Sequence, residues 1–265
     1  MAKSAGNRSD TDRLPATNAA GKTRAPRILP IAAWGPIESI VTAILIYIVP
    51  QAVALTLLSV MYQLSSGQGL IDVLDSGANS QVTLLIYTVI AESLSLLCLH
   101  MFLRYKKSSW RDLGFRKPKR SLWLYVLGGY ALYFVLLIVG LMAADALFPS
   151  FNINQAQETG YEGGDGVTKL LPLVGLVFIP PFVEEVLFRG FLYQGLRTKL
   201  GMWSSAIIVS VIFGLAHQQW NVAIDTFILS MVMVYIFEKT GSLWATIALH
   251  MLKNSIAFVA LFLTR

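Results

Sequence analysis

The sequence is poor in the residues that usually carry charge, disulfides and metal ions. It has one cysteine, Cys98, and three histidines. A single cysteine excludes an intramolecular disulfide and cannot by itself build a cysteine-based metal site. Charged residues make up only 14% of the 265 residues, whereas 55% are hydrophobic, and the mean hydropathy is +0.61. These values exclude an ordinary soluble domain and predict a polytopic membrane protein.

Seven apolar segments are interpreted as helices that cross a hydrocarbon core of about 30 Å. They run roughly from Trp34 to Met61, Gln81 to Leu103, Leu122 to Ala146, Thr168 to Leu196, Trp203 to Trp220, Val222 to Phe237, and Leu243 to Leu263. The predicted fold is therefore an all-α, polytopic transmembrane helix bundle of about seven spans, which occupies residues 29–265.

Residues 1–28 are polar and basic and cannot build a core, so we expect a disordered tail there. The first apolar run begins near Ile31 and is too long for the apolar region of a signal peptide. We therefore expect no cleavable signal peptide.

The net charge of +6 is distributed unevenly among the connections between the predicted spans. Lysine and arginine occur in the tail and in the second, fourth and sixth connections. The first connection instead carries Asp72 and Asp75, and the third carries Glu158, Glu162 and Asp165. Because basic connections face the cytoplasm, this alternation predicts a cytoplasmic N-terminus and explains the charge without a nucleic-acid partner. We expect an integral protein of a bacterial plasma membrane.

Three short motifs place polar side chains inside apolar segments, where lipid cannot solvate them. Such residues are candidates for function. They are Glu184-Glu185 with Arg189, Phe213 with His217, and His250 with Asn254.

The spacing of the first motif separates its two acids. On a helix Glu185 and Arg189 share a face, whereas Glu184 is turned about 100° away. Glu185 is therefore expected to neutralise Arg189 and to leave Glu184 free to face a cavity as a general base. Pro180-Pro181 removes two N–H donors and predicts a kink or restart of the helix just before the acids.

Depth in the membrane links the three motifs. With a rise of 1.5 Å per residue, Glu184, His217, His250 and Asn254 lie roughly 10–21 Å from the inner ends of their helices. All four therefore fall in the middle to outer-middle of the bilayer, which predicts one shared site. Gly214 and Ala216 are expected to let a neighbouring helix approach closely.

The motifs Glu-Glu-x-x-x-Arg, Phe-x-x-x-His and His-x-x-x-Asn, in this order on late hydrophobic helices, resemble those of the CPBP family. That family includes CAAX prenyl endopeptidases, bacteriocin-processing proteins and the bacterial abortive-infection proteins. The resemblance covers a family core at about residues 171–257, and it implies a metal-independent intramembrane glutamate endopeptidase without a cofactor. The implied substrate is a membrane-associated peptide, either a tail that follows a lipidated cysteine or a secreted peptide.

The resemblance also implies roles for the motif residues. Glu184 and His217 would activate a water, and His250 and Asn254 would bind the oxyanion. Supporting roles are implied for three further residues, which are Glu185, Arg189 and Phe213.

Other functions remain open from the residues alone. Glutamates and histidines are plausible zinc ligands, although the sequence has no His-Glu-x-x-His motif and asparagine is a poor zinc ligand. A non-catalytic immunity or partner-binding protein would use the same polar residues as contacts, and a transporter would be expected to show paired broken helices. Glu92, Asp225 and Lys253 are expected to be hydrogen-bonded packing groups or to lie at a cavity edge, with Lys253 off the face that His250 and Asn254 share. The oligomeric state is not predicted.

Overall fold

The computed structural model describes residues 29, 31–67, 69, 72, 80–116, 121–149, 152, 155, 157–161, 168 and 170–263. Within these residues all regular structure is helical, and none is a strand. The prediction of an all-α fold is confirmed. The expected disordered tail at residues 1–28 lies outside the described residues.

Among the described residues, five helices are long and apolar enough to cross a membrane, and the chain is an integral, multi-pass membrane protein. They are α1 (Pro36–Ser66), α3 (Ser80–Tyr105), α4 (Leu122–Leu147), α8 (Trp220–Thr240) and α9 (Leu243–Phe258), which continues as the π-helix η5 (Val259–Leu263). A short 3₁₀ helix, η1 (Trp110–Leu113), follows α3.

Glycines end two of these helices. Gly67 after α1 has a φ of 69°, and Gly241 after α8 has a φ of 65°. Glycine adopts this left-handed conformation without a Cβ clash, so it stops a helix in which apolar periodicity alone would allow continuation. Pro36 in the first turn of α1 similarly fixes where that helix begins.

The fourth predicted span is a helix that alternates between π and α register. It consists of π-helix η3 (Leu173–Phe178), α5 (Ile179–Glu184), π-helix η4 (Glu185–Tyr193) and α6 (Gln194–Leu196). The tandem prolines lie at the start of α5, so the predicted restart before the acids is present. We call residues 171–196 the broken helix.

The fifth predicted span ends earlier than its apolar sequence suggested. Helix α7 (Met202–Leu215) has 14 residues, and His217 lies in the turn that follows it. Gln218 in this turn has a φ of 58°, so the chain leaves the helical path before Trp220. By length and composition the described chain has five candidate spans, and the expected count of seven is not confirmed.

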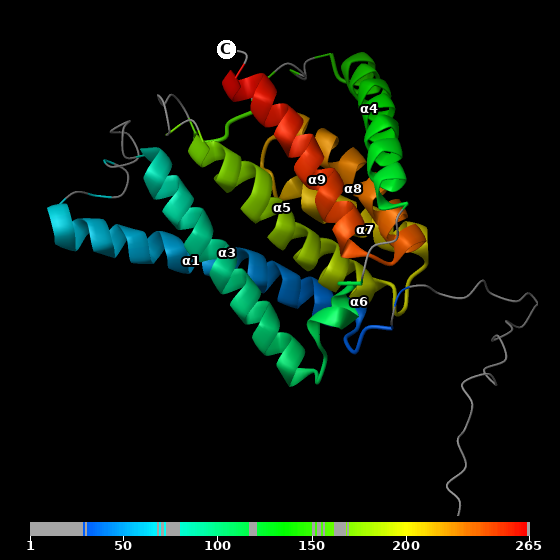
Figure 1. Ribbon diagram of the computed structural model, residues 1–265, viewed down its shortest axis with the longest axis horizontal. Helices are drawn as coiled ribbons and strands as arrows, with labels where there is room; N and C mark the ends of the chain where they lie inside the picture. Colours follow the sequence, from blue (N-terminus) through cyan, green and yellow to red (C-terminus); the bar gives the residue numbers. More distant parts are fainter. Residues whose placement is uncertain are drawn as a thin grey trace, which may run out of the picture.

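The broken helix runs through the centre of the bundle (Figure 1). Helices α1 and α3 pack on one side of it, while α7, α8, α9 and α4 form the other side. All nine residues of η4 are buried, in contrast to the apolar outer faces of α1, α3 and α4, which are exposed. Exposed apolar side chains on membrane helices are those that contact lipid.

Helices α7 and α8 approach closely at Gly214, as predicted. A Cβ at Gly214 would lie 2.9 Å from the carbonyl oxygen of Ala223 in α8. The absence of a side chain there lets the turn that carries His217 lie against the start of α8.

Candidate active site

The first motif contains a fully buried ion pair. Arg189 Nη1 lies 2.8 Å from Glu185 Oε1, and both side chains have no exposed surface. The guanidinium carbon of Arg189 lies 4.5 Å from the centre of the Phe213 ring, a cation–π distance. The predicted pair between Glu185 and Arg189 is therefore present, and the aromatic face covers the charge that the carboxylate does not contact.

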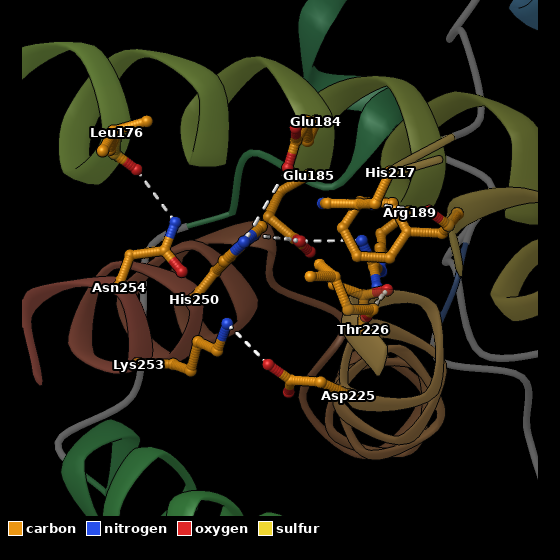
Figure 2. A network of polar contacts seen from close by, with 12 residues as sticks. Leu176, Glu184, Glu185, Arg189, His217, Asp225, Thr226, His250, Lys253 and Asn254 are labelled. Carbon is orange, nitrogen blue, oxygen red and sulfur yellow. Dashed lines mark hydrogen bonds and ion pairs between the residues drawn. The ribbon is translucent and has the colours of Figure 1, made fainter. Parts of the chain in front are cut away.

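His250 of α9 lies between the two acids of the first motif (Figure 2). Its Nδ1 is 3.1 Å from Glu185 Oε1, and its Nε2 is 3.7 Å from Glu184 Oε2. The ring is buried, and it connects the closed ion pair to the second glutamate.

The two adjacent glutamates have different surroundings. Glu185 is completely enclosed, whereas the Glu184 side chain is 19% exposed and lines a cavity. The sequence-based division between a neutralised acid and an acid that faces a cavity is therefore seen in the structure.

His217 is held by the backbone of the helix that it follows. Its Nδ1 lies 2.8 Å from the carbonyl oxygen of Phe213. A carbonyl can only accept, so Nδ1 carries the proton, and the neutral imidazole has its lone pair on Nε2. His217 lies in the lining of the same cavity as Glu184.

Phe213 contacts both imidazoles. Its ring centre lies 5.0 Å from that of His217 and 5.9 Å from that of His250, in both cases edge to face. The ring also packs against Phe188 of the broken helix at 4.9 Å. Phe213 thus positions side chains from three helical segments.

Asn254 is anchored by a carbonyl that the prolines leave free. Its Nδ2 donates to the carbonyl oxygen of Leu176 at 2.8 Å. In a helix that carbonyl would accept from the N–H of residue 180, or of residue 181 in π register. Both residues are proline and have no N–H. The tandem prolines therefore create the acceptor that orients Asn254.

One cavity of about 190 Å³ brings the predicted residues together. Its polar part is lined by eight residues, which are Gln157, Thr159, Glu184, His217, Thr226, His250, Lys253 and Asn254. Its lining also contains apolar residues from the end of α9 and from η5, which are Ala257, Phe258, Leu261 and Phe262. The four residues predicted to act on water and on the oxyanion therefore share one chamber.

Lys253 lines the cavity and pairs with Asp225, which agrees with the expectation of a packing group or a group at a cavity edge. It was also expected off the face that His250 and Asn254 share, yet its side chain reaches the same chamber as theirs. It follows His250 by three residues, a spacing that places side chains on neighbouring parts of one face, and its long stem extends the reach of the charge. Glu92 of α3 is not among the described residues that line the cavity.

The described residues contain no group of three or more histidine, cysteine, aspartate or glutamate side chains arranged to hold a metal ion.

Comparison with known proteins supports the motif-based resemblance. Residues 166–256 match the family model described as Type II CAAX prenyl endopeptidase Rce1-like. This segment contains all seven motif residues, and the predicted resemblance to the CPBP family is confirmed over it.

A relative from Bacillus subtilis (strain 168), named "Putative membrane peptidase YdiL", is 24% identical over 143 residues. The matched region covers 53% of this chain and 58% of the relative, so the similarity spans less than two thirds of that protein. No solved structure matches the chain significantly.

Proposed function

We propose that this membrane protein is an intramembrane glutamate endopeptidase that hydrolyses peptide bonds without a metal ion. The observation that carries the proposal is the position of Glu184. Its carboxylate faces the cavity that His217, His250 and Asn254 also line, while the adjacent Glu185 is closed off with Arg189. The match to a CAAX endopeptidase family model and the name of the bacterial relative support a peptidase reaction.

Water activation is assigned to Glu184 and His217. The Glu184 carboxylate takes a proton from water, and the Nε2 lone pair of neutral His217 accepts the other water hydrogen and orients the oxygen. The water oxygen bonds to the peptide carbonyl carbon. The C–N bond then breaks, and the proton held by Glu184 passes to the leaving amine. The second water hydrogen stays on the new carboxylic acid, which releases it to solvent as a proton, so the products are a carboxylate and a free amine.

His250 and Asn254 are assigned to the oxyanion. In the form with N–H groups on both ring nitrogens, Nδ1–H of His250 donates to Glu185 and Nε2–H can donate to a developing negative charge. The Asn254 amide has two N–H donors, and the carbonyl of Leu176 uses one of them. The second is available to the oxyanion, with its direction set by the first.

Glu185 and Arg189 are assigned as positioning residues. Neither lines the cavity, and Glu185 holds the Nδ1 side of His250. The Arg189 charge keeps Glu185 ionised, which fixes the orientation of the His250 ring.

The finer features of location and substrate are part of the same proposal. The charge alternation supports a cytoplasmic N-terminus, and the broken helix with α7 would add two short spans to the five long ones. The substrate is a membrane-associated peptide, of the CAAX type or an unmodified one, that a bacterial plasma membrane presents.

A cleavage assay in liposomes tests the proposal. Purified wild type and Glu184→Gln receive a library of prenylated and unmodified membrane peptides, and mass spectrometry identifies the products. Glu38→Gln is the matched control, because it makes the same change to a carboxyl group of another helix, which pairs with Lys106 and does not line the cavity. We expect cuts with wild type and Glu38→Gln and none with Glu184→Gln.

Other outcomes would assign the site differently. Equal cutting by wild type and Glu184→Gln would show that Glu184 is not the base. No cutting by folded wild type would favour a non-catalytic partner-binding or immunity role.

A further inference from the structure

One ion pair reaches the cavity through its cation, and the proposed mechanism does not use it. Lys253 Nζ of α9 lies 2.9 Å from Asp225 Oδ2 of α8 (Figure 2). Ionised groups inside membrane helices are costly and mark functional positions when they face a cavity. This pair is therefore a candidate for a second task at the same site.

Asp225 is held from both sides. Its Oδ1 accepts a hydrogen bond of 2.6 Å from the Tyr133 hydroxyl of α4, while its Oδ2 pairs with Lys253. Three helices thus fix the carboxylate. Lys253 has three N–H donors, and the Asp225 carboxylate engages it at one oxygen. The ammonium group keeps donors for another acceptor.

The surroundings of this pair differ from those of the structural pair in the broken helix. Glu185 and Arg189 are both 0% exposed, whereas the side chains of Lys253 and Asp225 are 12% and 22% exposed. Lys253 lines the cavity, and Asp225 is not among the lining residues. An ion pair that served only to join two helices would not need a cation that lines the cavity, as Lys253 does.

We propose that Lys253, positioned by Asp225, binds a carboxylate of the substrate inside the cavity; this inference rests on the proposed function. Lys253 lies three residues after His250, about 4.5 Å further along the helix axis. The carboxylate bound there belongs within a few residues of the cleaved bond. Either the C-terminal carboxylate of a peptide or an acidic side chain supplies this chemistry.

The apolar part of the cavity favours recognition of a charge. An ammonium group that is largely buried, as Lys253 is at 12% exposure, attracts an anion more strongly than one in water. Without an anion, the Lys253 donors that Asp225 does not engage would lack an acceptor. A substrate with a neutral end should therefore bind more weakly than one with a carboxylate.

Binding to a catalytically inactive chain tests the inference separately from cleavage. Glu184→Gln is reconstituted in nanodiscs with a fluorescent hexapeptide of leucine, valine and alanine. One form has a free C-terminal carboxylate and another a C-terminal amide. Two further amides carry glutamate or glutamine at the penultimate position, so that the two sources of a carboxylate are distinguished.

The matched variant removes both charges together. Lys253→Met with Asp225→Asn, in the Glu184→Gln background, avoids leaving one buried charge alone. We expect a peptide with a carboxylate to bind at least about tenfold more tightly than its neutral counterpart, as a charged hydrogen bond contributes. We expect the double variant to lose this ratio. A purely structural pair would change the thermal stability without changing the ratio.

Three results would overturn the inference. They are equal binding of acidic and neutral peptides, a ratio that persists in the double variant, and no measurable binding of any acidic peptide. Cleavage by wild type identifies which proposal has failed. Wild type that cuts acidic and neutral peptides equally well leaves the protease in place and removes the carboxylate site. A binding preference without any cleavage leaves the carboxylate site in place and removes the protease.

Discussion

The two faces of the broken helix each carry a glutamate, but they differ in burial and in the partners of that glutamate. One face carries Glu184 toward the cavity, and the other buries Glu185 with Arg189 under the Phe213 ring. The two glutamates are adjacent and chemically identical. The difference shows that burial and partners, not residue type, separate an acid available for chemistry from an acid that holds the site together.

The largest effect is expected on the cavity face. Glu184→Gln keeps the size of the side chain but removes the base, so we expect the cleavage rate to fall roughly 10³–10⁴-fold. The stability should change much less than in a variant of the enclosed Glu185, because the Glu184 side chain is partly exposed and its partner, His250 Nε2, lies 3.7 Å away. Cleavage kinetics and thermal unfolding in detergent measure the two quantities. A Glu184→Gln variant that loses stability but keeps the wild-type cleavage rate would contradict the assignment of Glu184 as the base.

On the face of the broken helix that buries Glu185, a substitution should mainly lower the free energy of unfolding. Glu185→Gln leaves the Arg189 charge buried without its partner, and we expect a loss of about 3–5 kcal/mol in the free energy of unfolding. Denaturant unfolding of the purified chain measures it, with Glu184→Gln as the matched control. Equal stabilities of the two variants would contradict the assignment of Glu185 as a structural acid.

A substitution of Asn254, which lines the cavity from helix α9, extends the comparison to the proposed oxyanion donors. Asn254→Ala removes one proposed oxyanion donor, and we expect the rate to fall about 10²–10³-fold. The loss should be seen in kcat more than in KM, because the donor acts on charge that develops during the reaction. A change confined to KM would assign Asn254 to substrate binding.

A smaller effect is expected from Pro180→Ala. The new N–H can donate to the Leu176 carbonyl and compete with Asn254 for it, so we expect a loss of a few-fold in kcat with the fold retained. The same substitution in the Asn254→Ala background is the control. If the proline acts through Asn254, it should have no further effect there.

Removal of metal ions should have the smallest effect. With a glutamate as base, we expect cleavage to persist after treatment with a chelator. Activity that is lost and then restored by Zn²⁺ would replace the glutamate mechanism with the zinc-dependent alternative.

Apolar runs predicted the long helices well, because lipid imposes length and composition on them. The expected range from Leu122 to Ala146 differs from α4 by one residue. The ion pair between Glu185 and Arg189 followed from their spacing alone. By contrast, the fifth predicted span extended past His217 to Trp220, although the polar residues His217, Gln218 and Gln219 directly follow α7 and were the available signal for its end.

The missing parts of the site depend on backbone detail and on long side chains. The acceptor for Asn254 is a main-chain carbonyl of Leu176, and side-chain spacing on α9 contains no information about it. Pro180-Pro181 was the available signal, since two absent N–H groups imply an acceptor nearby. Lys253 was expected off the face of His250 and Asn254 because ideal helical directions do not include the reach of its four-carbon side chain, which carries the charge into the cavity.

One aromatic ring has a consequence for how this site can change over time or by design. The Phe213 ring contacts Arg189, His217 and His250, and its backbone carbonyl holds His217. A different side chain at this position would move the buried cation and both imidazoles together. A substitution at Phe213 therefore cannot change one catalytic group without the others. Substitutions of residues that line the cavity away from this ring, such as Lys253, are the better route to a new specificity.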